Sequence, residues 1–254
     1  MEITFLGTGT SHGVPKIGCS CRVCTSTDSK NNRYRSSIHI RQDDLSLVID
    51  TGPEFRLQML RSHITRLDGV FYTHNHADHI NGIDDLRVFS ETSPLTVYGP
   101  SDVIDDLHHR FSYAIGTNPF KGGIPQLNTV IVSQEGVTVG KLKVIPIELI
   151  HGCRKVFGYR IGDFAYLSDC KVIPEHSYEK LQGVKTVVID ALRYREHPTH
   201  MNVDQAVASS LIIGAETVYL THMSHELEHE TLERELPGHI HPAYDGLKIN
   251  VPIR

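Results

Sequence analysis

Four side chains that can bind a metal ion fall within six residues of this sequence, and they are His74, His76, Asp78 and His79. The apolar and aromatic residues 70–73 just before them predict a buried strand, and residues 80–89 predict a turn into a helix. Two histidines two residues apart on extended backbone point to the same side. Imidazole nitrogens beside carboxylate oxygens suit zinc, manganese, iron or nickel. A histidine-rich surface loop is the alternative, but the position directly after an apolar strand favours a metal site.

Three further apolar strands each end at a single residue that can bind the same metals. The predicted strands 145–150, 164–168 and 218–221 are followed directly by His151, Asp169 and His222. Any one of them alone would more often be an ordinary polar strand end. Together with the first cluster they give seven ligands, a number that suits two metal ions sharing one carboxylate.

Composition sets limits on the class of protein. The 254 residues are 39% hydrophobic and 22% charged, as in ordinary globular domains, and the net charge of -5 gives no broad basic face for nucleic acid. The first seven residues lack the features of a signal peptide, and no stretch is long enough to cross a bilayer. Cys19, Cys21 and Cys24 are too crowded for the disulfides of a small secreted domain, while Cys153 and Cys170 are expected to be small core residues. We therefore predict a cytoplasmic protein.

Predicted strands come in clusters, each followed by a helix, and this order occurs twice. The pattern favours two mixed sheets face to face with helices outside, in a single domain over 1–254. Ser101 and Asn202 are expected to cap helices. Residues 112–127 carry three glycines and two prolines and predict an irregular loop, a candidate lid. His108, His109 and the histidines from 225 to 241 are expected at the surface.

The ligand pattern His74-x-His76-x-Asp78-His79, followed by His151, Asp169 and His222, resembles the metallo-β-lactamase superfamily. That resemblance implies an α/β fold, the four-layer αββα sandwich, with a dinuclear metal site at one edge of the sheets. It also implies the division of the ligands: His74, His76 and His151 on one metal, Asp78, His79 and His222 on the other, and Asp169 bridging. Asp50 matches the aspartate that orients ligands without binding metal.

Other segments are similar to the PhnP-like branch of phosphodiesterases, which is related to tRNase Z and to the PQQ-biosynthesis B proteins. These segments are Gly7-Thr8-Gly9-Thr10, Gly13-Val14-Pro15, Leu167-Ser168-Asp169, Leu220-Thr221-His222-x-Ser224-His225 and Asp245-Gly246, together with the three crowded cysteines. The resemblance implies a separate structural zinc held by Cys19, Cys21, Cys24 and His225. Three cysteines and one histidine form a closed tetrahedral set suited to this metal; three reduced cysteines without metal are the alternative.

The resemblance implies hydrolysis of a small or cyclic phosphodiester, of the phosphoribosyl 1,2-cyclic phosphate or cyclic nucleotide type. Two divalent ions, zinc or manganese with iron or nickel as further choices, would activate hydroxide. By the same resemblance His200 protonates the departing oxygen, and we place it with Asp78 as catalytic; an ordinary exposed loop histidine is the alternative. A small-molecule partner is predicted over nucleic acid or membrane, since no long glycine- and lysine-rich arm is present, and a homodimer is left open. A thioester, lactone or carbonyl-ester hydrolase and a non-hydrolytic PQQ-type metal protein are the competing functions.

Overall fold

Two mixed seven-stranded sheets form the centre of the molecule. The structure, a computed structural model, describes residues 1–116 and 123–252. The order of the first sheet is β14-β1-β2-β3-β4-β5-β6 and that of the second is β13-β12-β11-β10-β9-β8-β7. The first sheet comprises β1 (Glu2–Gly7), β2 (Ser37–Gln42), β3 (Leu45–Ile49), β4 (Gly69–Phe71), β5 (Leu95–Gly99), β6 (Leu127–Ile131) and β14 (Lys248–Asn250). The second comprises β7 (Val137–Val139), β8 (Leu142–His151), β9 (Arg154–Ile161), β10 (Phe164–Leu167), β11 (Thr186–Asp190), β12 (Thr217–Thr221) and β13 (Ile240–Pro242).

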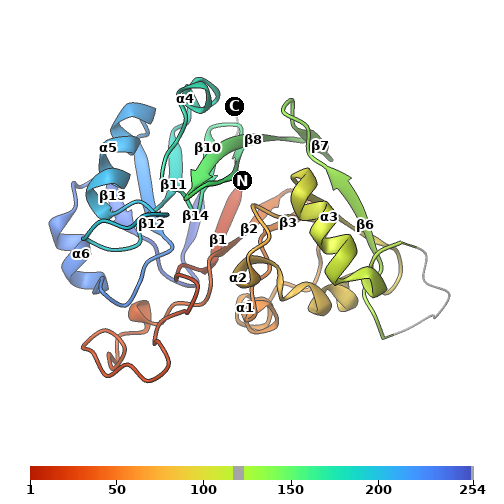
Figure 1. Ribbon diagram of the computed structural model, residues 1–254, viewed down its shortest axis with the longest axis horizontal. Coiled ribbons are helices and arrows are strands. Elements are labelled where there is room, and N and C mark those ends of the chain that lie inside the picture. The colour runs from red at the N-terminus through yellow and green to blue at the C-terminus, as the bar shows by residue number, and fades with distance from the viewer. Residues whose placement is uncertain (117–122, 253–254) are drawn as a thin grey trace.

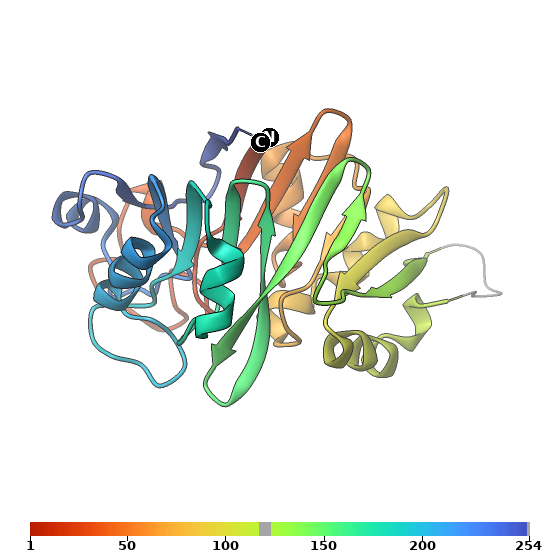
Figure 2. The ribbon, with the colours of Figure 1, turned by 90° about the horizontal axis from the view of Figure 1, so that it is seen from above.

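Helices cover the outer face of each sheet (Figures 1 and 2). The helices beside the first sheet are α1 (Phe55–Ser62), α2 (Ala77–Ile80), α3 (Ser101–Arg110) and the 3-10 helix η2 (Ile83–Phe89). Those beside the second are α4 (Glu175–Leu181), α5 (Val203–Ile213) and α6 (His229–Glu235), and two single turns, η1 (Ser29–Asn31) and η3 (Ser112–Ala114), lie in connections. Within residues 1–116 and 123–252, no helix has the length and hydrophobicity needed to span a bilayer.

The apolar core is divided into three parts, as a four-layer sandwich requires. Phe5, Phe71 and Tyr159 belong to the part between the two sheets. A second part, which includes Val48 and Leu107, lies between the first sheet and its helices. The third packs the second sheet against α4, α5 and α6. The predicted αββα sandwich is therefore confirmed.

Several local predictions need correction. The turn into a helix predicted for residues 80–89 is found as a turn at Asn81 and Gly82 followed by η2, but this helix is 3-10, and the short helix α2 before the turn was not expected. A Cβ atom at Gly82 would lie 2.3 Å from the carbonyl oxygen of Gly52, so a residue without a side chain is needed at this turn. Ser101 is not a cap, because Pro100 occupies the N-cap position and no side chain caps this helix. The cap at Asn202 is confirmed by a capping box with Gln205.

The sequence also provides expectations for the exposure of two cysteines and of His229, and for the loop 112–127. Cys170 is buried as predicted, but Cys153 is exposed because it lies in the turn between β8 and β9. His229 is buried beside Tyr244 and the segment that carries Asn31, contrary to the surface position expected for it. The predicted loop 112–127 contains η3 and the start of β6, and its residues 117–122 lie outside the described residues.

Candidate metal centre

The seven residues expected to bind metal lie in two adjoining groups that share Asp169. One group is His74, His76, His151 and Asp169, and the other is Asp78, His79, Asp169 and His222. Within each group, one ligand atom per residue can be chosen so that all lie within 4.8 Å of one another. Segments up to about half the chain apart therefore meet at one edge of the sandwich.

This convergence follows from the strand directions. β3 runs parallel to β4, and β10 runs parallel to β11 and β12, so the carboxyl ends of these strands reach the same edge. The residues just beyond β3, β10 and β12 are Asp50, Asp169 and His222, and all three have left-handed backbone, with φ of 63°, 53° and 58°. Non-glycine residues adopt this conformation at a cost of about 1–3 kcal/mol, and such strain is concentrated at functional sites.

Hydrogen bonds of the Nδ1 atoms fix the orientation of three imidazole rings. The Nδ1 atom of His79 donates to the Asp50 carboxylate at 2.7 Å, and that of His151 donates to the carbonyl of Thr199 at 2.9 Å. His74 Nδ1 lies 3.0 Å from the Thr73 hydroxyl, which itself donates to Asp50 at 2.8 Å. Each ring therefore turns its Nε2 atom toward the shared space, which is the arrangement that metal-binding histidines require.

The buried nitrogens facing this space fit a metal ion. The Nε2 atoms of His74, His79 and His222 are inaccessible to solvent and have no hydrogen-bond partner. Leaving such an atom without a partner costs about 1–3 kcal/mol. The same atoms lie 3.7, 3.2 and 3.4 Å from the Asp169 carboxylate oxygens. Three unpartnered lone pairs around one buried carboxylate match the donor set of a divalent cation.

The charge states agree with this fit. Burial by itself would raise the pKa of Asp169, but His222 and His79 lower it well below its usual range, so this carboxyl is ionised. Burial lowers the pKa of His222 to about 3 and that of His74 well below its usual value, so both rings are neutral at pH 7. Neutral imidazole and ionised carboxylate are the forms that bind metal. His79 differs: burial would lower its pKa, but the carboxylates of Asp169, Asp78 and Asp50 raise it well above the usual value, so a divalent ion would have to displace a proton from this ring.

A separate group consists of Cys19, Cys21, Cys24 and His225. The sulfur atoms of Cys19 and Cys21 each lie 3.4 Å from His225 Nδ1. The hydrogen bond from His225 lowers the pKa of Cys21 to about 6. The group thus joins the N-terminal loop to the segment that follows His222.

His200 lies beside the two metal groups, and it has a partner that the sequence analysis missed. Its ring centroid is 4.6 Å from those of both His151 and His222. Its Nδ1 atom donates to the carboxylate of Asp190 at 2.7 Å, and Asp190 also accepts from the backbone N–H of Cys170. The signal for Asp190 was present, since it ends an apolar strand in the same way as the assigned ligands.

Comparisons with known proteins agree with the geometry. The sequence profile of the Beta-lactamase superfamily domain matches residues 46–223. A solved structure described as a new diphosphatase from the PhnP family has 39% sequence identity and a TM-score of 0.93, over 99% of this chain and 98% of that chain. The chain belongs to the metallo-β-lactamase superfamily and, within it, to the PhnP family. The fold and family predicted from the sequence are therefore confirmed, and the superfamily fold implies divalent metal ions.

Other relatives of this PhnP-family chain have different names, and one of them is described as zinc-bound. Zinc-bound PqqB from Methylobacterium extorquens shares the fold, with a TM-score of 0.81 at 18% identity over 99% of this chain and 100% of that chain. The octanoyltransferase of Porphyromonas gingivalis is 41% identical over 98% of this chain and 51% of its own length. Ribonuclease Z of Listeria innocua is 32% identical over 63% of this chain and 49% of its own length. The chain spans about half the length of these two curated relatives.

Proposed function

We propose that this PhnP-family chain is a dinuclear metal-dependent phosphoric diester hydrolase that acts on a small or cyclic phosphodiester. The observation that carries the proposal is the pairing of His200 with the buried Asp190 next to the two ligand groups. Hydrolysis of a phosphodiester with a poor leaving group needs a proton donor at the departing oxygen, and a buried histidine held by a carboxylate suits this role. The diphosphatase and ribonuclease Z names of its relatives support a phosphoesterase.

We further propose a role for each residue of the metal centre. His74, His76 and His151 would hold one divalent ion, Asp78, His79 and His222 a second, and Asp169 would bridge them. Such ions lower the pKa of a bound water molecule and offset negative charge on phosphate oxygens. Asp50, Thr73 and the Thr199 carbonyl keep the rings turned toward that space. His200 delivers its proton to the leaving oxygen while Asp190 fixes the orientation of its ring.

A substrate comparison tests this function. The protein, loaded with manganese or zinc, should hydrolyse bis(p-nitrophenyl) phosphate faster than p-nitrophenyl acetate. It should also hydrolyse a ribose 1,2-cyclic phosphate or a 2′,3′-cyclic nucleotide. Faster turnover of the acyl ester would instead support the carbonyl-hydrolase alternative, for which the octanoyltransferase relative gives a reason. If the protein hydrolysed neither phosphodiesters nor the acyl ester with zinc, manganese, iron or nickel, the non-hydrolytic alternative would be supported.

A diphosphate substrate is a second candidate, and the position of Arg154 favours it. The side chain of Arg154 donates to the Asn75 amide oxygen at 3.1 Å, and Asn75 lies between two proposed ligands. Its charge contributes to the lowered pKa of His76, after burial and in opposition to the two nearby carboxylates. Within the described residues no carboxylate lies within 4 Å of this guanidinium, which is therefore free to bind a second phosphate.

Replacing Arg154 with alanine is expected to raise the KM for a substrate with a second phosphate about tenfold and to change kcat by less than about threefold, because one charge-assisted hydrogen bond is lost. Steady-state kinetics on a nucleoside diphosphate and on a cyclic monophosphate measure this difference. Lys155→Ala is the matched control, since Lys155 is the next residue and already pairs with Glu148 at 3.1 Å. Equal KM changes for both substrates would remove Arg154 from phosphate recognition.

The Asp190–His200 pair predicts a pH effect. Burial alone would lower the pKa of His200, but the Asp190 carboxylate raises it to about 9. A proton donor acts in its protonated form, so its contribution is present below this pH and is lost as the pH rises through it. In Asp190→Asn the pKa of His200 falls, and we expect the alkaline limb of kcat to move down by at least about one pH unit. The pH dependence of kcat, measured on a diester with an alkyl leaving group, tests this. An alkaline limb at the same pH in Asp190→Asn and in the unchanged protein would contradict it.

We propose that Cys19, Cys21, Cys24 and His225 bind structural zinc. Cys24→Ser is then expected to lose one equivalent of zinc and to lower the melting temperature by at least about 5 °C, because the site ties the N-terminal loop to the segment after His222. Metal analysis and thermal melts measure both effects. Cys153→Ser is the control, since this exposed cysteine lies outside the group. Identical zinc content in the two variants would show that the cysteines hold no metal.

A further inference from the structure

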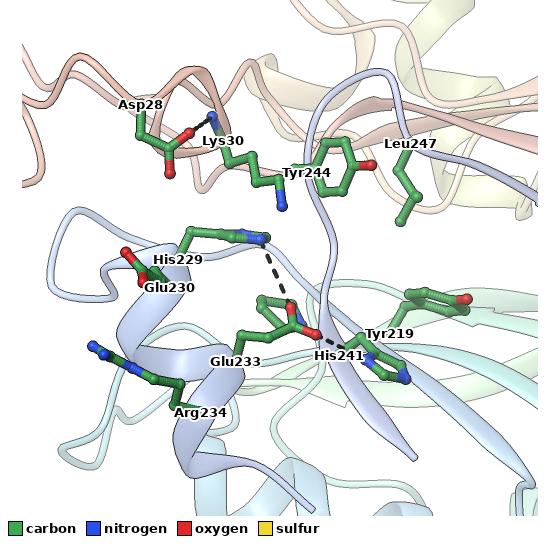
Figure 3. Close-up of a pocket in the computed structure, with 11 residues that line it drawn as sticks. Asp28, Lys30, Tyr219, His229, Glu230, Glu233, Arg234, His241, Tyr244 and Leu247 are labelled. Atoms are coloured by element: carbon green, nitrogen blue, oxygen red, sulfur yellow. Dashed lines mark hydrogen bonds and ion pairs between the residues drawn. The ribbon is translucent and has the colours of Figure 1, made fainter. Parts of the chain in front are cut away.

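A cavity of about 550 Å³ lies away from the metal centre, between α6, the strands β12 and β13, and the segments around Lys30 and Tyr244 (Figure 3). None of the seven proposed metal ligands lines it, and neither does His200. Its size is within the range of small-molecule sites. Tyr219, Tyr244 and Leu247 give it an apolar wall, and polar side chains enter from α6 and η1.

His229 is the residue that indicates a ligand in this cavity. The residue is only 2% exposed, yet both of its ring nitrogens lack a hydrogen-bond partner. Figure 3 shows its ring directed between Lys30 and Glu233, and the edge-on ring of Tyr244 lies 5.6 Å away. Burial lowers the pKa of His229 to about 4, so the ring is neutral and offers one N–H donor beside one acceptor. An unpartnered buried polar group of this kind costs about 1–3 kcal/mol.

Groups on the two sides of His229 differ in charge. On one side, the ammonium of Lys30 lies 4.9 Å from the centre of the Tyr244 ring. Among the described residues this ammonium has no carboxylate within 4 Å. On the other side, Glu233 accepts a hydrogen bond from His241 at 3.0 Å. The cavity thus offers a cation, a donor–acceptor pair and a carboxylate, in this order, along an aromatic wall. The charged side chains of Asp28, Glu230 and Arg234 also line it.

We propose that this cavity binds a nucleoside monophosphate. The phosphate would pair with Lys30, the flat base would lie against the tyrosine rings with its edge on His229, and a ribose hydroxyl would donate to Glu233. Aromatic faces bind any base, and the donor–acceptor pair of a neutral imidazole matches a base edge. An inorganic anion alone would leave the aromatic wall and the acceptor nitrogen of His229 unused.

A metal ion fits this cavity poorly. The two oxygens of Glu233 serve different histidines, with Oε2 3.7 Å from His229 and Oε1 3.0 Å from His241. Among the described residues, these three side chains do not form a group with all ligand atoms within 4.8 Å, whereas the residues of the metal centre do. The geometry therefore favours an organic ligand over a third metal site.

Isothermal titration calorimetry with AMP tests the proposal. The folded protein carries Asp169→Asn, so that binding at the metal centre is suppressed, and each titration is repeated in the otherwise unchanged protein. AMP is expected to bind one site, more tightly than adenosine or ribose 5-phosphate. Lys30→Met should weaken AMP binding about tenfold, because the phosphate loses its cation. Lys143→Met, at an exposed position on β8, should leave it unchanged.

Each result that would overturn the proposal points to a different explanation. AMP binding that disappears with Asp169→Asn would place the nucleotide in the metal centre. AMP binding that is unaffected by both Lys30→Met and His229→Phe would place it elsewhere. Ribose 5-phosphate binding as tightly as AMP would exclude recognition of the base, and zinc chloride binding that depends on His229 would make the cavity a metal site. Lys30 is exposed, so Lys30→Met keeps the test decisive if His229→Phe fails to fold.

Discussion

Replacing His200 with alanine is expected to slow hydrolysis of a phosphodiester with an alkyl leaving group by about 10²–10⁴-fold, the usual contribution of a positioned proton donor. An alkoxide is a poor leaving group and departs only when protonated. A p-nitrophenolate needs no proton, so turnover of bis(p-nitrophenyl) phosphate by the same variant should fall less than about tenfold. The ratio of kcat values for the two substrates measures the effect.

The best control for His200→Ala is His197→Ala. His197 belongs to the same loop, its ring centroid is 5.2 Å from that of His200, and its Nδ1 atom accepts a hydrogen bond from Thr199. A change there disturbs the loop without removing the proposed proton donor, so it should affect both substrates alike. If His200→Ala also slows both substrates equally, His200 positions other groups and does not donate a proton.

The fold and the ligand groups could be predicted because they depend on a regular feature, the strand end. Several apolar strands carry a polar residue just beyond their last apolar position, and parallel strands bring these ends to one edge. His151, Asp169 and His222 were found in this way, and the structure brings them to the His74–His79 cluster. Asp190 follows the same rule, but one carboxylate at a strand end has no distinctive spacing that would identify it from the sequence.

Other features depend on distant backbone and could not be predicted from local sequence. The short helix α2 was not expected, and the turn after it brings Gly82 against Gly52, some 30 residues earlier in the chain. His229 looks like a surface residue on an acidic helix, yet it is buried, and its backbone N–H donates to the side chain of Asn31 at 2.9 Å. Periodicity describes the neighbours of a residue along the chain and not the segment that covers it.

Asp169→Asn is expected to lower kcat/KM by at least about 10³-fold, even for bis(p-nitrophenyl) phosphate. Asp169 is the one residue common to both ligand groups, and its Oδ1 atom lies 3.2 and 3.4 Å from the Nε2 atoms of His79 and His222. An amide has neither the charge nor the second anionic oxygen of a carboxylate, so the affinity for divalent ions falls at both positions. Loss of several kcal/mol of electrostatic stabilisation corresponds to a rate effect of about this size.

The matching control is Asp163→Asn. Asp163 precedes β10 and Asp169 follows it, so both changes remove one carboxylate from the ends of the same strand. The Asp163 backbone carbonyl accepts from Lys185 and Thr186, and this contact survives the substitution. Metal analysis should find normal content in Asp163→Asn and a loss of active-site metal in Asp169→Asn, while the structural zinc proposed at Cys19, Cys21, Cys24 and His225 should be retained in both. Full activity with a full complement of metal in Asp169→Asn would contradict a bridging carboxylate, and with it the dinuclear centre.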